Sequence, residues 1–250
     1  MPDAAEHLTD DAFLGGRLHI LQPETGFRAG LDSVLLAAAI PAKPGETVFE
    51  AGTGAGVAAL CLAARCPDVR VEGLEVQPEL AALARRNAQR NGLGERIQVE
   101  TGSITESCPP EAANRFDHAM ANPPFFDRAA ATPPPAEAKA RAHMAGRDEL
   151  ESWVRGLLAR LRHKGSLSLV YPGAGLAGVL AALEGRAGDI IVVPLWPGGG
   201  RPAKRVIVSA RKGSGAPLRL MPGLTLHEGG NFTDGAQAIL RHGAALNLKS

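Results

Sequence analysis

The sequence predicts an α/β domain in which helices cover both faces of a mostly parallel sheet of about seven strands. From Glu46 onward, short runs of β-branched and apolar residues alternate with stretches that carry apolar residues at helical spacing. A glycine-rich turn follows the first of these runs, which is typical of the first strand–helix unit in sheets that bind nucleotides. The alternation favours parallel strands, because each helix returns the chain to the same edge of the sheet.

Seven runs after Glu46 are expected to form the strands of the sheet. They lie at 47–50, 70–75, 97–100, 116–120, 167–171, 190–193 and 206–209. Helices are expected through 60–63 and from about Leu80. The clearest helix is predicted for 148–164, where apolar residues fall at helical spacing and Gly165 supplies a stop signal.

The residues before the sheet are predicted to form a lead-in that packs on it. Two short apolar runs, 18–21 and 27–28, flank a Pro-Glu-Thr-Gly turn and suggest a hairpin. A helix is expected to follow from Asp32. We therefore expect a lead-in at 1–45 and one main domain at 46–250, rather than two independent domains.

Composition places the chain among ordinary globular proteins. Hydrophobic residues make up 45% and charged residues 21% of the 250 positions, and no apolar run approaches the roughly 18 residues that span a bilayer. The acidic amino terminus lacks the basic start and apolar stretch of a signal peptide. Cys61, Cys66 and Cys108 form no CxxC pair, so neither a disulfide framework nor a zinc site is expected. These features predict a cytoplasmic protein with no membrane partner and no metal.

The net charge of +1 is the sum of two unequal parts. Residues 1–136 carry 11 basic and 18 acidic side chains, a balance of −7, whereas residues 137–250 carry 16 and 8, a balance of +8. A basic carboxyl-terminal part favours a polyanionic partner such as RNA, although solvated surface charges would give the same pattern.

The first functional motif is Glu50–Gly56 (EAGTGAG), between the first predicted strand and its helix. Gly52, Gly54 and Gly56 would let the backbone approach a ligand and point amides of the helix start toward it. Glu75 ends the second predicted strand, where an acid can accept hydrogen bonds from both ribose hydroxyls. This order of strand, glycine turn, helix, strand and acid predicts a nucleoside-type cofactor.

The spacing of the glycines and the position of Glu50 distinguish between such cofactors. Sites for NAD or FAD favour GxGxxG, because the pyrophosphate rests on the helix amides. Here the spacing is GxGxG, and Glu50 lies just before the glycines. A carboxylate there would repel a pyrophosphate but would hold the ammonium group of a methionine-like cofactor. The motif therefore favours S-adenosyl-L-methionine.

The second functional motif is Asn122-Pro123-Pro124-Phe125, which follows the fourth predicted strand at the carboxyl edge of the sheet. The Asn122 side-chain oxygen and the Pro123 carbonyl can each accept a hydrogen from an exocyclic amine and so make its nitrogen more nucleophilic. The prolines fix the backbone so that both acceptors converge, and Phe125 offers a face for stacking a flat base. The motif predicts methyl transfer to an amino nitrogen; the alternative is a proline-rich turn without a catalytic role.

Together these residues resemble the class I S-adenosylmethionine-dependent methyltransferases that modify amino groups of adenine, guanine or glutamine. With the lead-in segment 27–36 (FRAGLDSVLL), the chain more narrowly resembles the bacterial methyltransferases that modify N6 of adenine in valine tRNA, over roughly residues 15–245. The resemblance implies a Rossmann-like class I methyltransferase fold, S-adenosyl-L-methionine as cofactor and tRNA as substrate. The residues it implies are Gly52, Gly54, Gly56 and Glu75 for the cofactor, and Asn122 and Phe125 for the base.

Two positions depart from the pattern of that family. Phe125 stands where tyrosine is frequent, and phenylalanine is shared with guanine-N2 methyltransferases. Ser103 stands near a position where family members usually have an acid beside the cofactor adenine, so Ser103 or a backbone amide must serve there. Guanine N2 in RNA, adenine in DNA and a protein glutamine stay open as acceptors. A cofactor-regulated RNA-binding protein without catalysis is the non-enzyme alternative, and the intact NPPF motif argues against it.

Some polar residues allow two interpretations each. Asp32 would either contact the methionine end of the cofactor or act as N-cap of the helix that begins there. Basic residues in and beside the predicted loops 129–147 and 197–203 would either hold RNA phosphates or carry solvated charge. The RNA-binding candidates are Lys139, Arg141, Arg147, Arg201 and Lys204.

Overall fold

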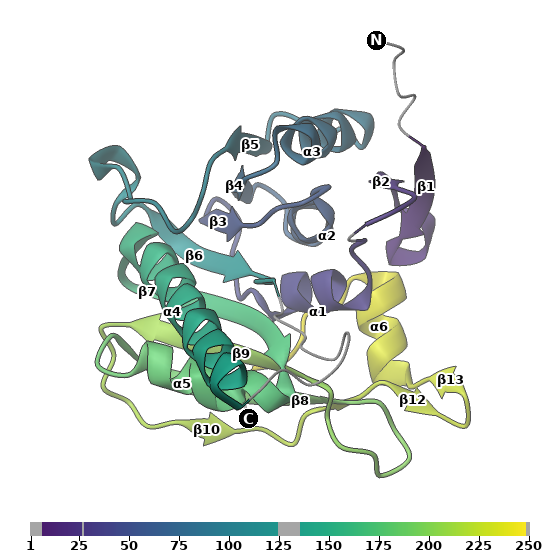
Figure 1. The fold of residues 1–250 in the computed structure, drawn as a ribbon. Helices are drawn as coiled ribbons and strands as arrows, with labels where there is room; N and C mark the ends of the chain where they lie inside the picture. Colours follow the sequence, from purple (N-terminus) through teal and green to yellow (C-terminus); the bar gives the residue numbers. More distant parts are fainter. Residues whose placement is uncertain (1–6, 27, 125–135, 249–250) are drawn as a thin grey trace.

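A computed structural model of the chain describes residues 7–26, 28–124 and 136–248, with the backbone alone over 136–147. Its centre is one nine-stranded sheet (Figure 1). The strands are, in spatial order, β10 (Arg219–Leu220), β8 (Ala187–Trp196), β9 (Arg205–Lys212), β7 (Leu161–Pro172), β6 (Phe116–Ala121), β3 (Thr47–Ala51), β4 (Arg70–Glu75) and β5 (Ile97–Thr101), with β11 (Leu224–Thr225) also beside β8.

The pairing in this sheet is mostly parallel, as predicted. Only β9 runs against its neighbours, β7 and β8. The seven predicted strands correspond to β3 to β9, so the predicted α/β fold is confirmed. The two additional strands, β10 and β11, have two residues each and pair only with β8. Segments of that length are too short to show an alternating pattern in the sequence.

Helices cover both faces of the sheet (Figure 1). One face is covered by α1 (Leu31–Ala39), α2 (Val57–Arg65), α3 (Pro78–Arg90) and α6 (Asp234–His242), and the other by α4 (Ala136–Arg160) and α5 (Leu176–Leu183). Each face has its own apolar core, in which Leu60 and Leu157 are examples of fully buried residues. Short 3-10 turns lie at Leu14–Gly16, Pro110–Ala112 and Gly173–Gly175. Because α2 and α3 return the chain between parallel strands, the carboxyl ends of β3, β4, β5 and β6 share one edge.

The predicted amino-terminal hairpin exists, but its pairing was wrong. The strand β2 (Leu18–Pro23) pairs with β1 (Leu8–Phe13), which precedes it, and not with Arg28; Phe27 lies outside the described residues. The reason is the buried Gln22, whose side-chain amide exchanges hydrogen bonds of 2.9 and 3.2 Å with the backbone of Ala29. A side chain therefore takes the place of the second strand that the sequence suggested.

Two asparagines on α3 attach this hairpin to the core. Asn87 exchanges two hydrogen bonds of 2.9 Å with the backbone of Leu21 and donates a third, also 2.9 Å, to the Ala55 carbonyl. One turn later, Asn91 exchanges hydrogen bonds of 3.0 and 2.9 Å with the backbone of His19. These side-chain amides imitate a neighbouring strand along the edge of β2. The lead-in is thereby held against the glycine turn that contains Ala55.

The helix predicted for 148–164 begins and ends earlier in the structure. It begins at Ala136, inside the segment 129–147 that was predicted as a loop, and it ends at Arg160. Strand β7 follows directly, because Leu161 is fully buried and pairs with Phe116 on β6. Sheet pairing thus overrides the helical periodicity over the last predicted residues.

Candidate active site

The glycine turn joins β3 to α2 at the carboxyl edge of the sheet. Gly52, Gly54 and Gly56 have φ angles of +67°, +56° and +90°, which residues with a side chain rarely adopt. The Gly52 amide donates a hydrogen bond of 2.8 Å to the Leu74 carbonyl on β4. A Cβ on Gly52 would approach the Trp153 ring to 2.9 Å, so close packing also requires glycine there.

Glu75 ends β4 beside this turn and is buried. Its Oε2 accepts a hydrogen bond of 2.8 Å from the Gly54 amide, and its Oε1 accepts one of 3.0 Å from the Gln77 amide. Each oxygen can accept a second donor, such as a ribose hydroxyl. Glu75 therefore fixes the conformation of the glycine turn, a role that its position in the sequence did not reveal.

Glu50 is a second buried carboxyl at this edge, on β3 just before the turn. Burial raises the pKa of its carboxyl well above the usual value; a hydrogen bond from the Ala59 backbone opposes the shift, and the charge of Glu75 adds to it. Its Oε2 has no hydrogen-bond partner among the described residues. Leaving a buried acceptor unpaired costs about 1–3 kcal/mol. Such an atom in a native structure is typical of a site that a ligand completes.

Asn122 carries the second open acceptor. It follows β6, whose Ala121 lies opposite Ala51 of β3, and its Oδ1 is buried without a partner in the described part of the chain. Asn122 and Glu50 line one cavity together with Gly52 and Gly54. Asn122 of the second motif and the glycine turn, 66 residues or more apart in the sequence, therefore meet at one cavity.

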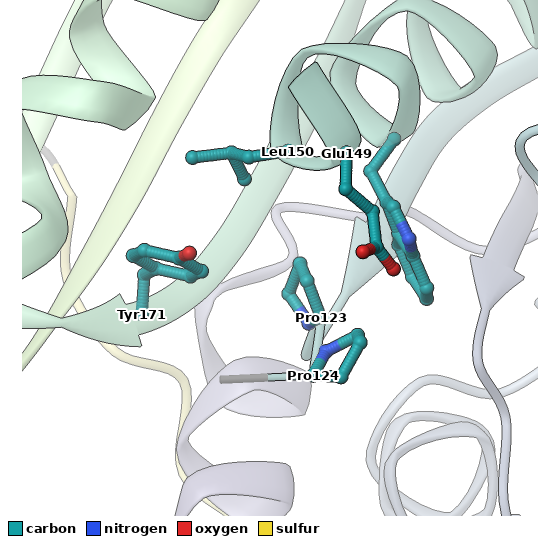
Figure 2. Close-up of a pocket in the computed structure, with 6 residues that line it drawn as sticks. Pro123, Pro124, Glu149, Leu150 and Tyr171 are labelled. Atoms are coloured by element: carbon teal, nitrogen blue, oxygen red, sulfur yellow. The ribbon is translucent and has the colours of Figure 1, made fainter. Parts of the chain in front are cut away.

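The two prolines of the second motif lie at a neighbouring cleft. Figure 2 shows Pro123 and Pro124 between the side chain of Tyr171, from the end of β7, and that of Glu149, from α4, with Leu150 above. Burial, together with the negative charge of Glu149, raises the pKa of the Tyr171 hydroxyl. The motif thus has the cavity on one side and these packed side chains on the other, which holds its backbone in place.

Sequence reasoning missed the residues that form the far wall of the cavity. Gln22 and Ser33 of the lead-in line the cavity. Asn87 is fully buried and does not line the cavity, but its hydrogen bond to the Ala55 carbonyl holds a lining residue in place. A signal for Asn87 was available. It lies one turn after Leu83 on the apolar face of a helix, where a polar side chain must find buried partners.

Asp32 lies beside the cavity but does not line it. It sits in the first turn of α1, and its Oδ2 pairs with the Arg205 Nε at 2.9 Å. The helix N-cap is Gly30, with no side-chain capping hydrogen bond, so the N-cap interpretation of Asp32 is wrong. Its contact with a cofactor stays a prediction, and Ser33 is the residue of this turn that lines the cavity.

Ser103 follows β5 on the other side of Glu75. Its hydroxyl lies 2.8 Å from that of Thr105, and the preceding Gly102 amide donates a hydrogen bond of 2.9 Å to the Glu75 carbonyl. The segment is therefore adjacent to the predicted ribose acceptor, which is compatible with a role for Ser103 next to a nucleoside base.

The basic candidates for RNA contact fall in two places. Arg201 and Lys204 are exposed in the loop between β8 and β9, at the carboxyl edge of the sheet. Three others lie on α4 rather than in the predicted loop, with side chains outside the described residues: Lys139, Arg141 and Arg147. Phe125 also lies outside the described residues.

Two of the three cysteines, Cys61 and Cys66, belong to the apolar core on one face of the sheet. Cys61 is buried on α2, and Cys66 is buried just after the helix ends. Burial raises the pKa of the Cys61 thiol to about 12, with Glu50 adding to the shift.

Over the described ranges, no group of three or more His, Cys, Asp or Glu residues is arranged to hold a metal ion. Within the same ranges, no helix has the length and apolar character needed to cross a membrane.

Comparison with known proteins places this site in a family. The model of the methyltransferase small domain matches residues 28–172, which include both motifs. A protein of Porphyromonas gingivalis named tRNA1(Val) (adenine(37)-N6)-methyltransferase is 33% identical over 171 residues, 65% of each chain. A protein of Aeromonas hydrophila with the same name is 32% identical over 170 residues, 66% of this chain and 68% of that one. The match thus spans just under two thirds of the Porphyromonas relative.

A solved structure extends the likeness to most of the chain. The crystal structure of a predicted O-methyltransferase from Agrobacterium tumefaciens is 26% identical, with a TM-score of 0.74, and the match covers 88% of this chain and 99% of that one. The family model, these relatives and the shared fold agree on one assignment. The chain belongs to the methyltransferase small domain family, in the group that includes the tRNA1(Val) (adenine(37)-N6)-methyltransferases.

Proposed function

We propose that the chain uses S-adenosyl-L-methionine to methylate N6 of adenine in a tRNA. The observation that carries this proposal is the pair of buried oxygens, Glu50 Oε2 and Asn122 Oδ1, that lack partners among the described residues at one cavity. Each needs a hydrogen-bond donor from a ligand, and a cofactor ammonium and a substrate amine are such donors. The family supports the reaction, and the names of the relatives support the acceptor.

The residues around the cavity suit S-adenosyl-L-methionine better than a dinucleotide. When bound, this cofactor supplies a methyl group on a positively charged sulfur. Glu50 would hold its ammonium group, the glycine-turn amides its carboxylate, and Glu75 its ribose hydroxyls. Ser103 or a neighbouring amide would meet its adenine. A pyrophosphate would instead face the carboxyl of Glu50, which would oppose its binding.

The second motif would activate the acceptor nitrogen. The lone pair of an exocyclic amine is delocalised into the ring, and two hydrogen-bond acceptors draw the nitrogen toward a tetrahedral, nucleophilic state. Asn122 Oδ1 and the Pro123 carbonyl would be these acceptors, and Phe125 would stack on the base. The two acceptors would hold the amine hydrogens while a bound S-adenosyl-L-methionine supplied the methyl group, and one of these hydrogens would leave to solvent as a proton afterwards. No base has to remove a proton before the attack.

An oxygen acceptor, as in the name of the Agrobacterium structure, fits this site less well. A hydroxyl group gains nucleophilicity when a base removes its proton, and histidine is the most frequent base. Neither the cavity nor the cleft at the second motif includes a histidine among its described lining residues. Their carboxyls are Glu50, proposed above for the cofactor ammonium, and Glu149, whose charge acts on the Tyr171 hydroxyl. An asparagine and a backbone carbonyl accept hydrogen bonds but do not take protons, so they suit an amine.

The charge distribution supports RNA as the carrier of the adenine. The balance of +8 over residues 137–250 gives the molecule a basic part, and phosphate contacts supply much of the affinity of RNA-binding proteins. We propose that Arg201 and Lys204 contribute such contacts. The set also includes the three basic residues of α4, namely Lys139, Arg141 and Arg147.

Analysis of the methylated nucleoside tests the proposal. The purified protein is incubated with an unmodified tRNA transcript and a donor that carries an isotope-labelled methyl group. The RNA is then digested and its nucleosides are analysed by mass spectrometry. We expect label in N6-methyladenosine, and a transcript with the acceptor adenine replaced by uridine serves as control. Label in N2-methylguanosine would assign the acceptor to guanine, and no label in any RNA would refute the proposed substrate.

A further inference from the structure

A second polar groove lies at the carboxyl edge of the sheet, separate from the cofactor cavity. It is formed by the loop 197–204 between β8 and β9 and by the hairpin of β12 (His227–Glu228) and β13 (Asn231–Phe232). Its volume is about 860 Å³. Strand β8 runs parallel to β7, and Thr225 pairs with Trp196 at the end of β8. The groove therefore opens at the same edge as the NPP motif; Figure 1 shows the hairpin next to α6.

The charges of this groove differ from those elsewhere in the carboxyl-terminal part. Five arginines of that part form ion pairs with carboxylates: Arg162, Arg186, Arg205, Arg211 and Arg219. Arg201 lines the groove, and Lys204 follows three residues later in the same loop; both are exposed, and neither forms an ion pair with any described residue. The groove also contains one carboxyl, that of the exposed Glu228 on the hairpin. The Arg201 side chain donates hydrogen bonds of 3.0 and 3.1 Å to the carbonyls of Gly198 and Pro197. A guanidinium held in this way keeps a free side for an anion without losing its orientation.

The opposite wall of the groove offers a flat ring. The His227 imidazole stacks on the Phe232 ring, with centroids 4.6 Å apart and planes 28° apart. Both residues are partly exposed. Thr225, Glu228, Thr233 and the glycines at 198, 199, 229 and 230 complete the lining. Without side chains at the glycine positions, a sugar–phosphate chain can approach the backbone closely.

We propose that this groove binds the single-stranded RNA next to the acceptor adenine, with Arg201 and Lys204 on phosphates and His227 under a base. The proposal rests on the proposed function, because it takes the substrate to be RNA. Cation contacts along a strand combined with an aromatic stacking surface are the usual means of binding single-stranded nucleic acid. The position at the catalytic edge lets one strand reach both the groove and the NPP motif.

Binding of a fluorescently labelled, unmodified tRNA transcript, measured by anisotropy over a series of salt concentrations, tests this proposal. The variants are Lys204→Gln, Arg201→Gln, His227→Ala and His227→Phe. Lys204→Gln is the least disruptive of them, because the Lys204 side chain forms no hydrogen bond or ion pair with a described residue. Arg70→Gln is the matched control, since Arg70 is exposed at the amino edge of β4, on the opposite side of the sheet.

We expect Lys204→Gln and Arg201→Gln to weaken binding and to reduce the salt slope by about one each. His227→Ala should weaken binding by roughly five- to 150-fold, which corresponds to the loss of one stacked base, whereas His227→Phe should retain it. In a methylation assay the KM for tRNA should rise, with kcat and cofactor affinity unchanged. The control should bind tRNA as the wild type does.

Unchanged tRNA affinity and salt slope in both Arg201→Gln and His227→Ala would overturn the proposal, as expected if the groove served a protein partner. This failure is distinguishable from failure of the proposed function. If the wild type methylates tRNA and the groove variants bind it normally, the groove proposal fails alone. If the groove variants lose tRNA affinity but the wild type forms no methylated nucleoside, the groove proposal stands and the proposed reaction fails.

Discussion

The two edges of the central sheet differ in whether their buried polar groups have hydrogen-bond partners. At the amino edge, the His118 ring lies 2.6 Å from the Ser166 hydroxyl and 2.8 Å from the Glu46 carboxylate. At the carboxyl edge, Glu50 and Asn122 each have a buried oxygen without a partner among the described residues. The first arrangement is complete within the protein, and the second requires a ligand to complete it.

The amino edge contains a second set of polar side chains whose hydrogen bonds are satisfied within the protein. Asp117 accepts hydrogen bonds of 2.7 and 3.0 Å from the amide and hydroxyl of Thr47, and it pairs with Arg162 at 2.6 Å. These contacts join the first residues of β3, β6 and β7. Polar residues at this edge therefore stabilise the sheet. The difference teaches that open hydrogen-bonding capacity, rather than the presence of buried polar residues, distinguishes the candidate site from the supporting structure.

The largest expected effect concerns Asn122. Asn122→Ala removes one of two acceptors that bind more strongly as charge develops on the amine, so kcat should fall on the order of a hundredfold or more. The free energy of unfolding should stay near that of the wild type, because the lost oxygen has no partner among the described residues. Turnover is measured with labelled donor and unmodified tRNA, and stability by urea unfolding.

Asn114→Ala serves as the matched control for that substitution. Asn114 lies before the amino end of β6, and its Oδ1 accepts a hydrogen bond of 2.8 Å from Lys212. Its loss should leave kcat unchanged. Turnover of Asn122→Ala close to the wild type would contradict amine activation by this motif.

The next effect separates the two roles of Glu75. Glu75→Ala removes the ribose acceptor and the bond to Gly54, and it should weaken cofactor binding by about 1.5–3 kcal/mol. Glu75→Gln retains one oxygen, so it should weaken binding less. Calorimetry with S-adenosyl-L-methionine measures both, with NAD as the ligand expected not to bind. Equal, normal affinities in the two variants would remove Glu75 from the cofactor site.

A smaller effect is expected at the asparagine clamp of α3. Asn87→Ala leaves buried backbone groups of Leu21 and Ala55 without partners and should lower the free energy of unfolding by about 1–3 kcal/mol. Because Ala55 belongs to the glycine turn, cofactor affinity should also fall. Asn91→Ala is the control one turn away. It frees the more exposed His19 backbone and removes a side-chain hydrogen bond of 2.8 Å to the Asn87 carbonyl, within the same helix. It should therefore destabilise less and leave cofactor affinity unchanged; equal affinity losses in both variants would contradict this division of roles.

The sequence predicted the parts of this molecule that rest on local patterns. Seven strands follow from apolar spacing, and the position of Asn122 at the same edge as the glycine turn follows from the rule that parallel strands end at one edge. The pairing of β2 with β1 could not be predicted in this way, because it depends on the side chain of Gln22 bonding to Ala29. The end of α4 likewise depends on the pairing of Leu161 with Phe116, which helical spacing does not record.

Long-range polar partners were the least predictable feature of the site. Asp32 pairs with Arg205, 173 positions away, and nothing local to either residue indicates the other. The same holds for His118 and Glu46, 72 positions apart. Which buried polar groups are satisfied is a property of the folded chain, and the comparison between the two edges therefore required the structure.

The smallest expected effect is a difference in pH dependence between the edges. Burial, more than the opposing bond to Glu46, lowers the pKa of His118 below its usual 6.5, so its contribution to stability is present at neutral pH and is lost as the pH falls below that value. Glu50 has the opposite sign. Burial raises its pKa far above the usual 4.5, so the folded state loses stability as the pH rises from that value and the carboxyl ionises.

Urea unfolding of the cofactor-free protein between pH 5 and 8 tests both signs. His118→Gln should lose less stability than the wild type as the pH falls. Glu50→Gln should be more stable than the wild type, by a margin that grows as the pH rises. Parallel pH curves for the wild type and both variants would show that the two edges do not differ electrostatically, because each substitution removes the group that titrates at its own edge.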